Sequence, residues 1–441
     1  MRAAVELEGS GIRRVLQIIV LLCPALTVAV KGGANGSLMI AAALSLSVLL
    51  RQRRMSEGRA ADRSSHLVRA YALAMAAPVL VLLAVQTLHG GPWAVGAISS
   101  SARFLLAVPV VLVMWRIGRA LVPWADASFA LGALAAGAVM LFAPREWSPG
   151  RWGSQFLDPI NFGGLALLLG VLSLLSLDWY RRDPVLVRVL KIAGFVSGLG
   201  ASVPTGARGP WLALVVLIVV LAFTTLRGRS MAMRIALWTS LAAALLITFA
   251  TVDAFRGRFD LMAADLGSFV WGGERDTSPG VRLQIWRAAL MAFAERPLLG
   301  LGGGGFENAV DGYLSLGVLS PLAAEAARAE MHNSYLAYAA DFGTLGLLAL
   351  AALFAVPAAA FARRLGADPV GRRAALMGLV IVTMYASCAI SVDVFKLKMM
   401  AAFYAAATAF MAAIAFAGAD EDAQSTGGNR REPLTGNELR C

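Results

Sequence analysis

Long apolar stretches separated by short polar connections recur from the start of the chain almost to its end. Each is long enough, or nearly so, to cross a hydrocarbon core of about 30 Å as a helix. This pattern predicts an all-α fold, that of a polytopic integral membrane protein with about 12 transmembrane helices. The expected spans are 15–30, 34–50, 70–88, 102–115, 121–143, 159–177, 190–206, 210–225, 235–252, 333–361, 374–394 and 399–418.

The composition agrees with this pattern. Of 441 residues, 59% are hydrophobic and 15% are charged, and the mean hydropathy is +0.70, which is more apolar than a soluble domain of this length needs. We therefore treat 1–418 as one transmembrane domain. Residues 1–30 have the basic start and apolar stretch of a signal peptide, but no convincing cleavage site follows. The first span is therefore expected to be retained.

The net charge of +12 is distributed as a topology signal. If the N-terminus is inside, alternate connections place 25 of the 39 Lys and Arg residues on the inner side. Half of the remaining ones belong to a single long connection, which the positive-inside rule does not count. Both termini are therefore predicted inside, with anionic lipid headgroups as neighbours of the basic residues. Binding to nucleic acid is not expected.

The longest connection, 253–332, lies outside the membrane in this topology and carries seven arginines. A long structured connection of this kind is a typical place for chemistry. Ser278 and Pro279 are typical of a helix N-cap followed by proline, and predict a helix to Glu295. Its apolar stripe predicts contact with the membrane surface or with the roof of the bundle. The polar tail 419–441 is predicted to be cytoplasmic and disordered.

His332 lies where this long connection re-enters an apolar span, in the motif MHNSYLAYAADFGTLG. Imidazole is the side chain whose ordinary pKa allows proton transfer near neutral pH, and an ionisable group at a membrane boundary indicates function. The alternative is a solvated histidine at a helix end. The other two histidines, His66 and His89, are expected to be solvated.

Two arginines are candidate anion ligands on the same side. Arg282 and Trp286 are one helical turn apart near the start of the predicted helix, where a guanidinium matches phosphate oxygens and the helix N-terminus favours an anion. Arg208 lies in a tight turn between two spans, on the side where arginine is disfavoured. The alternatives are a headgroup contact for Arg282 and an interfacial anchor beside Trp211 for Arg208.

Several other motifs carry no expected chemistry. The glycine run 302–305 lacks the following Gly-Lys-Ser/Thr of a phosphate-binding loop and predicts a tight turn or hinge. Cys23, Cys388 and Cys441 form no disulfide framework or C-x-x-C site. No group of carboxylates or histidines on the outer side has metal-ligand spacing, so no metal and no cofactor is expected. Any phosphate must then be neutralised by arginines.

The order of these motifs resembles the O-antigen ligase and polymerase superfamily. The resemblance covers 155–350, about half of the chain, and the His-Asn motif is its most specific part. One departure is Ala207, where the family often has serine before the Arg-Gly pair. The segments that carry the resemblance, besides Arg208, are DPINFGGLALLLG at 158–170, GVRLQIW at 280–286, ERPLLGLGGGGF at 295–306 and HNSYLAYAADFGTLGLL at 332–348.

The resemblance implies a multi-pass, GT-C-like glycosyltransferase of the bacterial inner membrane, with 253–332 as a large periplasmic loop and an active site facing the periplasm. It would transfer a glycan from undecaprenyl pyrophosphate to an acceptor hydroxyl. An O-antigen ligase, the first expectation, uses lipid A-core as acceptor and completes lipopolysaccharide. A polymerase uses another lipid-linked repeat, and a protein O-oligosaccharyltransferase uses a protein serine.

In this scheme His332 is the catalytic base, and Arg208 and Arg282 bind the pyrophosphate. Nearby cations would lower the pKa of the histidine and favour its neutral form. The transfer would be metal-independent and inverting, and the protein is expected to act as a monomer. Possible supporting residues are Asn333, Tyr335, Trp286, Arg287, Lys396 and Lys398.

A secondary transporter or flippase is the competing class, since twelve spans with both termini inside is a common transporter plan. Transporters usually bury charges or broken helices near the bilayer midplane. In this chain the histidine and arginines gather at the outer boundary and in the long connection, which favours the enzyme.

Overall fold

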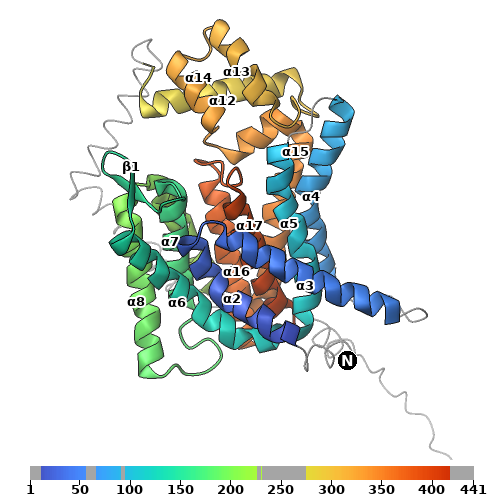
Figure 1. The fold of residues 1–441 in the computed structure, drawn as a ribbon, viewed down its shortest axis with the longest axis vertical. Coiled ribbons are helices and arrows are strands. Elements are labelled where there is room, and N and C mark those ends of the chain that lie inside the picture. The colour runs from blue at the N-terminus through green and yellow to red at the C-terminus, as the bar shows by residue number, and fades with distance from the viewer. Residues whose placement is uncertain (1–10, 56–65, 91–94, 226–229, 231–274, 418–441) are drawn as a thin grey trace, which may run out of the picture.

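The computed structural model describes residues 11–55, 66–90, 95–225, 230 and 275–417 (Figure 1). Within them the chain is helical apart from one short antiparallel hairpin, so the expected all-α fold is confirmed. The apolar helices are α2 (Gly11–Ala29), α3 (Gly33–Met55), α4 (His66–His89), α5 (Val95–Met114), α6 (Gly118–Phe142), α7 (Pro159–Leu175), α8 (Val185–Ser202), α9 (Arg208–Thr225), α15 (Ser334–Arg363), α16 (Pro369–Cys388) and α17 (Lys398–Phe416).

These helices overlap the expected spans wherever the structure describes the chain, with ends that differ by up to several residues. The expected span 235–252 lies outside the described residues, as do 253–274 of the long connection and the tail from 418 onward. Among the described residues, seven segments are long and apolar enough to cross a membrane, and one of them, Val95–Phe142, contains both α5 and α6. Helices α7 and α9 are apolar but shorter.

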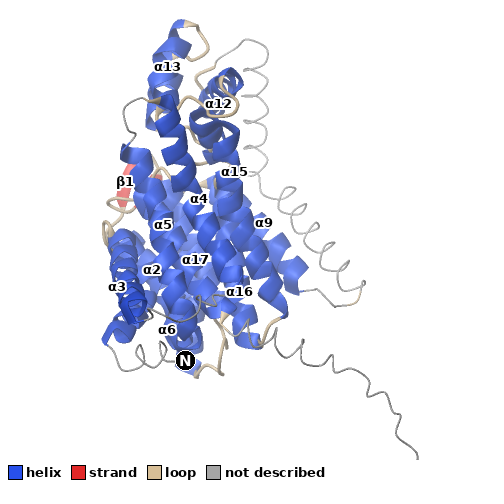
Figure 2. Cartoon of the chain, turned by 90° about the vertical axis from the view of Figure 1, so that its right-hand side faces the viewer, coloured by secondary structure: helices blue, strands red, loops and turns tan. Residues whose placement is uncertain are grey.

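Successive connections lie at opposite ends of the bundle, as the charge pattern predicts. At one end Arg119 pairs with Asp368, and Arg373 donates to the carbonyl oxygen of Leu175. At the other end, the side-chain amide oxygen of Gln86, near the end of α4, accepts from the backbone N–H of Gly303. In Figure 2, α12 and α13 lie at the upper end of the molecule, and α6 is labelled near the lower end of the bundle.

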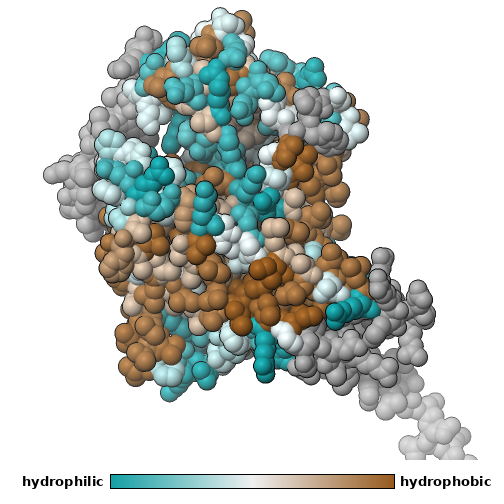
Figure 3. Space-filling view, viewed as in Figure 1, coloured by the Kyte–Doolittle hydropathy of each residue, from teal (hydrophilic) through white to brown (hydrophobic). Residues whose placement is uncertain are grey.

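The surface between the two ends is apolar. On the face that Figure 3 shows, a belt of hydrophobic residues crosses the bundle, with polar residues gathered above and below it. Large apolar side chains are exposed on separate helices, among them Leu73, Leu212 and Leu348. Such a belt would be unfavourable in water and is the surface that lipid covers.

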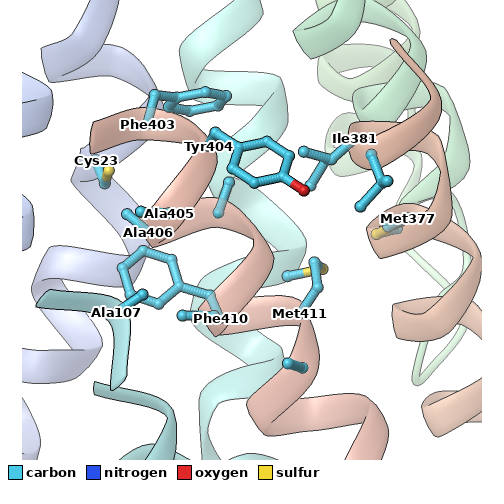
Figure 4. Close-up of a cluster of buried hydrophobic side chains, with 14 of the residues drawn as sticks. Cys23, Ala107, Met377, Ile381, Phe403, Tyr404, Ala405, Ala406, Phe410 and Met411 are labelled. Carbon is cyan, nitrogen blue, oxygen red and sulfur yellow. The ribbon is translucent and has the colours of Figure 1, made fainter. Parts of the chain in front are cut away.

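Helix α17 is the centre of the bundle. Every residue from Met399 to Phe416 is buried, and many of them are alanines, which let neighbouring helices approach closely. Its larger side chains, such as Phe403 and Phe410, lie among Cys23 of α2, Ala107 of α5 and residues of α16 (Figure 4). The few hydroxyls have partners, and Tyr404 donates to the carbonyl oxygen of Leu353 at 2.8 Å.

The described part of the long connection, 275–332, folds into a cap of three helices above the bundle (Figure 1). These are α12 (Ser278–Glu295), α13 (Gly305–Ser315) and α14 (Pro321–Ala329). They share a second hydrophobic core with the first turns of α15, and this core buries Val281, Ile285 and Ala288 of the apolar stripe of α12. The stripe therefore faces the interior of the cap. The cap residue of α12 is Thr277, one position before the expected Ser278.

Helix α15 is broken at Gly343, which has φ 62° and ψ −151°. The segment 297–302 fills the break: Thr344 N–H donates to Pro297 O, and Leu301 N–H donates to Ala340 O, both at 2.8 Å. A side chain at Gly343 would meet the carbonyl of Leu298 at 2.5 Å, so only glycine fits. The break joins the cap to the bundle, and it lies within the motif that contains His332.

Candidate active site

His332 lies in the short connection between α14 and α15, with its backbone in the left-handed region at φ 56°. A non-glycine residue adopts this conformation only where its surroundings hold it there. Here Asn333 follows as N-cap of α15 and accepts from Leu336 N–H at 3.1 Å, while Ser334 is fully buried. The helix start therefore fixes the position of the imidazole at the junction of cap and bundle.

The two ring nitrogens of His332 have different surroundings. Nδ1 is buried, with Glu330 Oε1 at 3.6 Å, and no described residue offers it a hydrogen-bond partner at normal distance. The side chain is 23% exposed, which leaves the opposite edge of the ring, with Nε2, accessible. The pKa of His332 is lowered to about 4, chiefly by burial and in addition by the positive charges of Arg282 and Lys396, against the negative charge of Asp158. The cations therefore lower the pKa of His332 as the sequence predicts, but burial lowers it more.

Glu330 ends α14 and reaches toward the connection between α16 and α17. Its Oε1 accepts the backbone N–H of Asp393 at 2.8 Å. The pKa of Glu330 is raised to about 7, chiefly by burial and in addition by the nearby carboxyls of Asp393 and Asp158, against the hydrogen bond from the Asp393 backbone and the charge of Lys396. Glu330 was not predicted as a site residue, although it is only two positions before His332.

The connection 389–397 corrects the expected span 374–394, because α16 ends at Cys388. Its backbone is bonded to site residues instead of continuing the helix: Val394 N–H donates to Ser334 Oγ at 3.0 Å, and Ser334 N–H donates to Ala389 O. The connection presents Asp393, whose pKa burial raises, and the exposed Lys396, whose ammonium donates to Arg328 O at 3.5 Å.

Asp158 reaches the site from the start of α7. It follows the hairpin of β1 (Arg145–Ser148) and β2 (Arg151–Gly153) and caps α7 by accepting from Ile160 and Asn161. Its charge acts on the pKa of both His332 and Glu330, which places it within the same electrostatic environment. The motif at 158–170 was noted in the sequence, but Asp158 itself was not singled out.

Arg282 and Trp286 lie on α12 as expected, both half-buried, and Arg282 acts electrostatically on His332. The indole N–H of Trp286 is buried, and it has no hydrogen-bond partner among the described residues. A buried donor of this kind is available to a phosphate oxygen. Arg287, on the same helix, is exposed.

Arg208 is the first residue of α9, and its side chain lies outside the described part of the chain. Its backbone is close to the site, because a side chain at the neighbouring Gly209 would meet Ser391 Oγ at 2.5 Å. Of the remaining supporting residues, Asn333 is the cap described above and Tyr335 donates to Ala386 O at 2.9 Å. Lys398 is exposed at the start of α17.

An apolar cleft opens below these residues, between α7, α9, α16 and α17. Its upper part touches Asn161 and the connection that holds Asp393, and its walls are otherwise almost entirely hydrophobic. The cleft thus joins the polar site to the apolar interior of the bundle. Its lining includes Asn161, Leu168, Pro210, Met384, Val392 and Met400.

His89 corrects one further expectation. Its Nδ1 lies 2.9 Å from Val85 O and its Nε2 lies 3.0 Å from Gly300 O, so the expectation of a solvated side chain is wrong. It joins the end of α4 to the segment that fills the break in α15. His66 is exposed, as expected.

Together, the helical bundle, its apolar belt and the polar site at one end define a polytopic integral membrane protein. Residues 193–351 match the model of a protein family described as O-Antigen ligase. The matched stretch contains Arg208, Arg282 and His332, and the match confirms the resemblance to the O-antigen ligase superfamily.

One curated protein is also similar to the chain. It is an uncharacterized protein of Haemophilus influenzae, 25% identical over 218 residues, which are 48% of this chain and 53% of that protein. The chain thus spans about half the length of this relative.

Proposed function

We propose that the protein is a membrane glycosyltransferase, an O-antigen ligase, that moves a glycan from undecaprenyl pyrophosphate to a hydroxyl of lipid A-core on the periplasmic face of the inner membrane. The observation that carries the proposal is the junction of cap and bundle. There a neutral histidine, His332, lies within the electrostatic reach of Arg282 and Lys396, and an apolar cleft is lined by Val392 and Val394 of the neighbouring connection 389–397. The family match over 193–351 supports the same class of enzyme.

His332 has the properties of a base for an acceptor hydroxyl. With its pKa lowered to about 4, the imidazole is neutral at pH 7 and its free nitrogen can accept a proton. The acceptor oxygen forms a bond to the anomeric carbon as its proton passes to Nε2 of His332. The bond from that carbon to the pyrophosphate breaks, and the pyrophosphate leaves with the electron pair. One in-line displacement inverts the anomeric centre.

The leaving pyrophosphate needs positive charge and donors. From the cap, Arg282 supplies a guanidinium and Trp286 an indole N–H that has no partner among the described residues, and the connection 389–397 supplies the ammonium of Lys396. Arg208 would complete the pyrophosphate contacts from the start of α9. The polyprenyl chain would lie in the apolar cleft beside Pro210, so that the lipid enters from the bundle and the pyrophosphate meets the cations.

The transporter alternative has one observation in its favour, a buried ion cluster. Lys191 is fully buried and contacts Asp126 at 2.7 Å and Asp183 at 3.0 Å. The cluster also includes a hydrogen bond from Lys191 to Ser176 O, and it lies at the end opposite to the cap. It fastens the connection between α7 and α8 to α6, which is a structural role.

The test incubates purified protein with undecaprenyl-pyrophosphate glycan and lipid A-core in EDTA, with no nucleotide and no ion gradient. Glycan appearing on lipid A-core supports the ligase. Longer lipid-linked glycan without lipid A-core product identifies a polymerase, and transfer only to a serine peptide identifies a protein O-oligosaccharyltransferase. Movement of the lipid-linked glycan across vesicles without any transfer identifies a flippase and refutes the enzyme.

A further inference from the structure

We propose that Glu330 is the positioning residue of the site, and that its carboxylate holds the Nδ1–H form of His332 so that Nε2 is left to accept the acceptor proton. This inference rests on the proposed function. It stands on geometry: Glu330 Oε1 lies 3.6 Å from Nδ1 of His332, which is buried and has no hydrogen-bond partner among the described residues.

The 3.6 Å separation is slightly longer than a hydrogen bond, as is common for catalytic pairs before substrate binds. A small rotation of the ring closes it, because Glu330 itself is fixed. The same Oε1 accepts Asp393 N–H at 2.8 Å, and Glu330 N–H donates to Ala326 O. The backbone of His332 is held by its left-handed conformation and by the Asn333 cap, so the ring is the part that moves.

The chemical consequence is a choice of tautomer. A neutral imidazole carries one proton, and the nitrogen that carries it is decided by the partner of the other nitrogen. A carboxylate at Nδ1 requires the proton there, so the lone pair is on Nε2. When Nε2 takes the acceptor proton, the imidazolium keeps its Nδ1–H toward Glu330, whose negative charge stabilises it.

Protonation of Glu330 reverses this arrangement. A carboxylic acid donates to Nδ1, which moves the histidine proton to Nε2 and removes the base. The pKa of Glu330, raised to about 7, places this change near neutral pH, well above the pKa of His332 at about 4. The charged groups facing the pair are Arg282 from α12, Asp158 from the start of α7, and Asp393 and Lys396 from the connection 389–397.

The variant that separates positioning from structure is Glu330→Gln. Glutamine keeps the oxygen that accepts Asp393 N–H, so the contact between α14 and the connection survives, while the charge is lost. We expect the transfer rate to fall about 10- to 100-fold at pH 8, less than the loss for His332→Ala. In the wild type the rate falls with a midpoint near pH 7 as the solution is acidified. In Glu330→Gln this decrease is absent down to about pH 5.

Two further variants complete the set. Glu330→Asp keeps the charge on a shorter side chain and should restore the decrease near neutral pH together with part of the rate. Glu325→Gln removes an exposed carboxylate from the same helix and should change neither the rate nor the pH profile.

A spectroscopic readout tests the pair without relying on activity. In protein labelled with ¹⁵N-histidine, the signal of His332 is identified by its loss in His332→Gln. We expect the Nδ1–H form above pH 7 in the wild type, a change to the Nε2–H form below it, and no such change in Glu330→Gln. If Glu330→Gln shows the same tautomer change and the same pH profile as the wild type, the positioning role is overturned while the glycosyltransferase stands. Absence of transfer by the wild type would overturn the proposed function alone.

Discussion

Asp341 accepts the backbone N–H of Phe306 at 2.9 Å, across the glycine run that joins the cap to the bundle. The other carboxylate oxygen accepts Gly304 N–H at 3.3 Å, and Gly302 and Gly304 both have positive φ. The run is therefore a tight turn closed on a carboxylate, one of the two forms expected from the sequence. Its function is to hold α13 against α15, close to His332.

Replacing Asp341 by alanine should destabilise the cap, because two buried N–H groups lose their acceptor. Each unsatisfied group costs about 1 to 3 kcal/mol, so we expect the two to lower the free energy of unfolding by about 2 to 6 kcal/mol. The thermal midpoint in nanodiscs measures this loss. Glu307→Ala, an exposed carboxylate in the same turn region, is the control and should leave the midpoint unchanged. Equal midpoints for the two variants would show that the turn does not depend on Asp341.

Gly343→Ala should also destabilise the protein, through strain. The residue has φ 62°, and an added methyl group would lie 2.5 Å from the backbone of Leu298. A residue forced into such a conformation costs about 1 to 3 kcal/mol, and the close contact adds to that cost. Gly312→Ala in α13 is the matched control, since its added methyl group meets nothing within 4 Å. There alanine should stabilise the helix by up to about 1 kcal/mol. The thermal midpoint in nanodiscs measures the effect of both variants. If Gly343→Ala keeps the wild-type midpoint, the break in α15 is not required for the stability of the protein.

The break in α15 and the connection 389–397 show where the sequence pattern was insufficient to predict the ends of the helices. Apolar residues continue through Gly343 and through 389–394, so hydropathy alone predicts unbroken spans there. Distant segments decide otherwise: 297–302 bonds to the freed backbone of α15, and Glu330 and Ser334 bond to Asp393 and Val394. Such tertiary partners leave no local signal.

The candidate site was predictable to a similar degree. His332 could be found because an ionisable group at a span boundary is unusual in itself, and Arg282 because it lies near a predicted helix start, one turn from Trp286. The structure brings the two into one electrostatic environment. Glu330 and Asp158 could not be distinguished from other acidic residues of the polar connections. Their importance comes from burial and from the approach of α7 and α14, which only the fold reveals.

His332→Ala should lower glycan transfer by about 10² to 10⁴, the usual contribution of a general base. Insertion into the membrane should be unaffected, because His332 lies in a connection outside α15. The measurement is transfer from undecaprenyl-pyrophosphate glycan at equal protein concentration. His66→Ala, which removes an exposed histidine at the other end of the bundle, should retain the full rate. A fully active His332→Ala would exclude this histidine as the base.

Arg282→Lys and Arg208→Lys should each be strongly impaired even though the charge is kept. An ammonium cannot make the two parallel contacts that a guanidinium makes with phosphate oxygens, and each good contact to a charged group contributes about 1.5 to 3 kcal/mol. We therefore expect the rate to fall about tenfold or more. Arg296→Lys, at the exposed end of α12, is the control. Wild-type rates in both lysine variants would make these arginines headgroup contacts and would move the pyrophosphate site toward Lys396.

The orientation of the bundle can be tested by labelling. In a background without cysteine, single cysteines at Ser278 and Ser315 of the cap should react with a membrane-impermeant maleimide in cells with a permeabilised outer membrane. A cysteine at Arg182, in the exposed connection between α7 and α8, should not react. The expectation follows from the excess of basic residues on the connections at the end of the bundle opposite to the cap. The proposed function depends on it, because a lipid-linked glycan and lipid A-core meet only outside the inner membrane. Labelling at Arg182 but not at the cap would place His332 in the cytoplasm and would refute the ligase and the polymerase together.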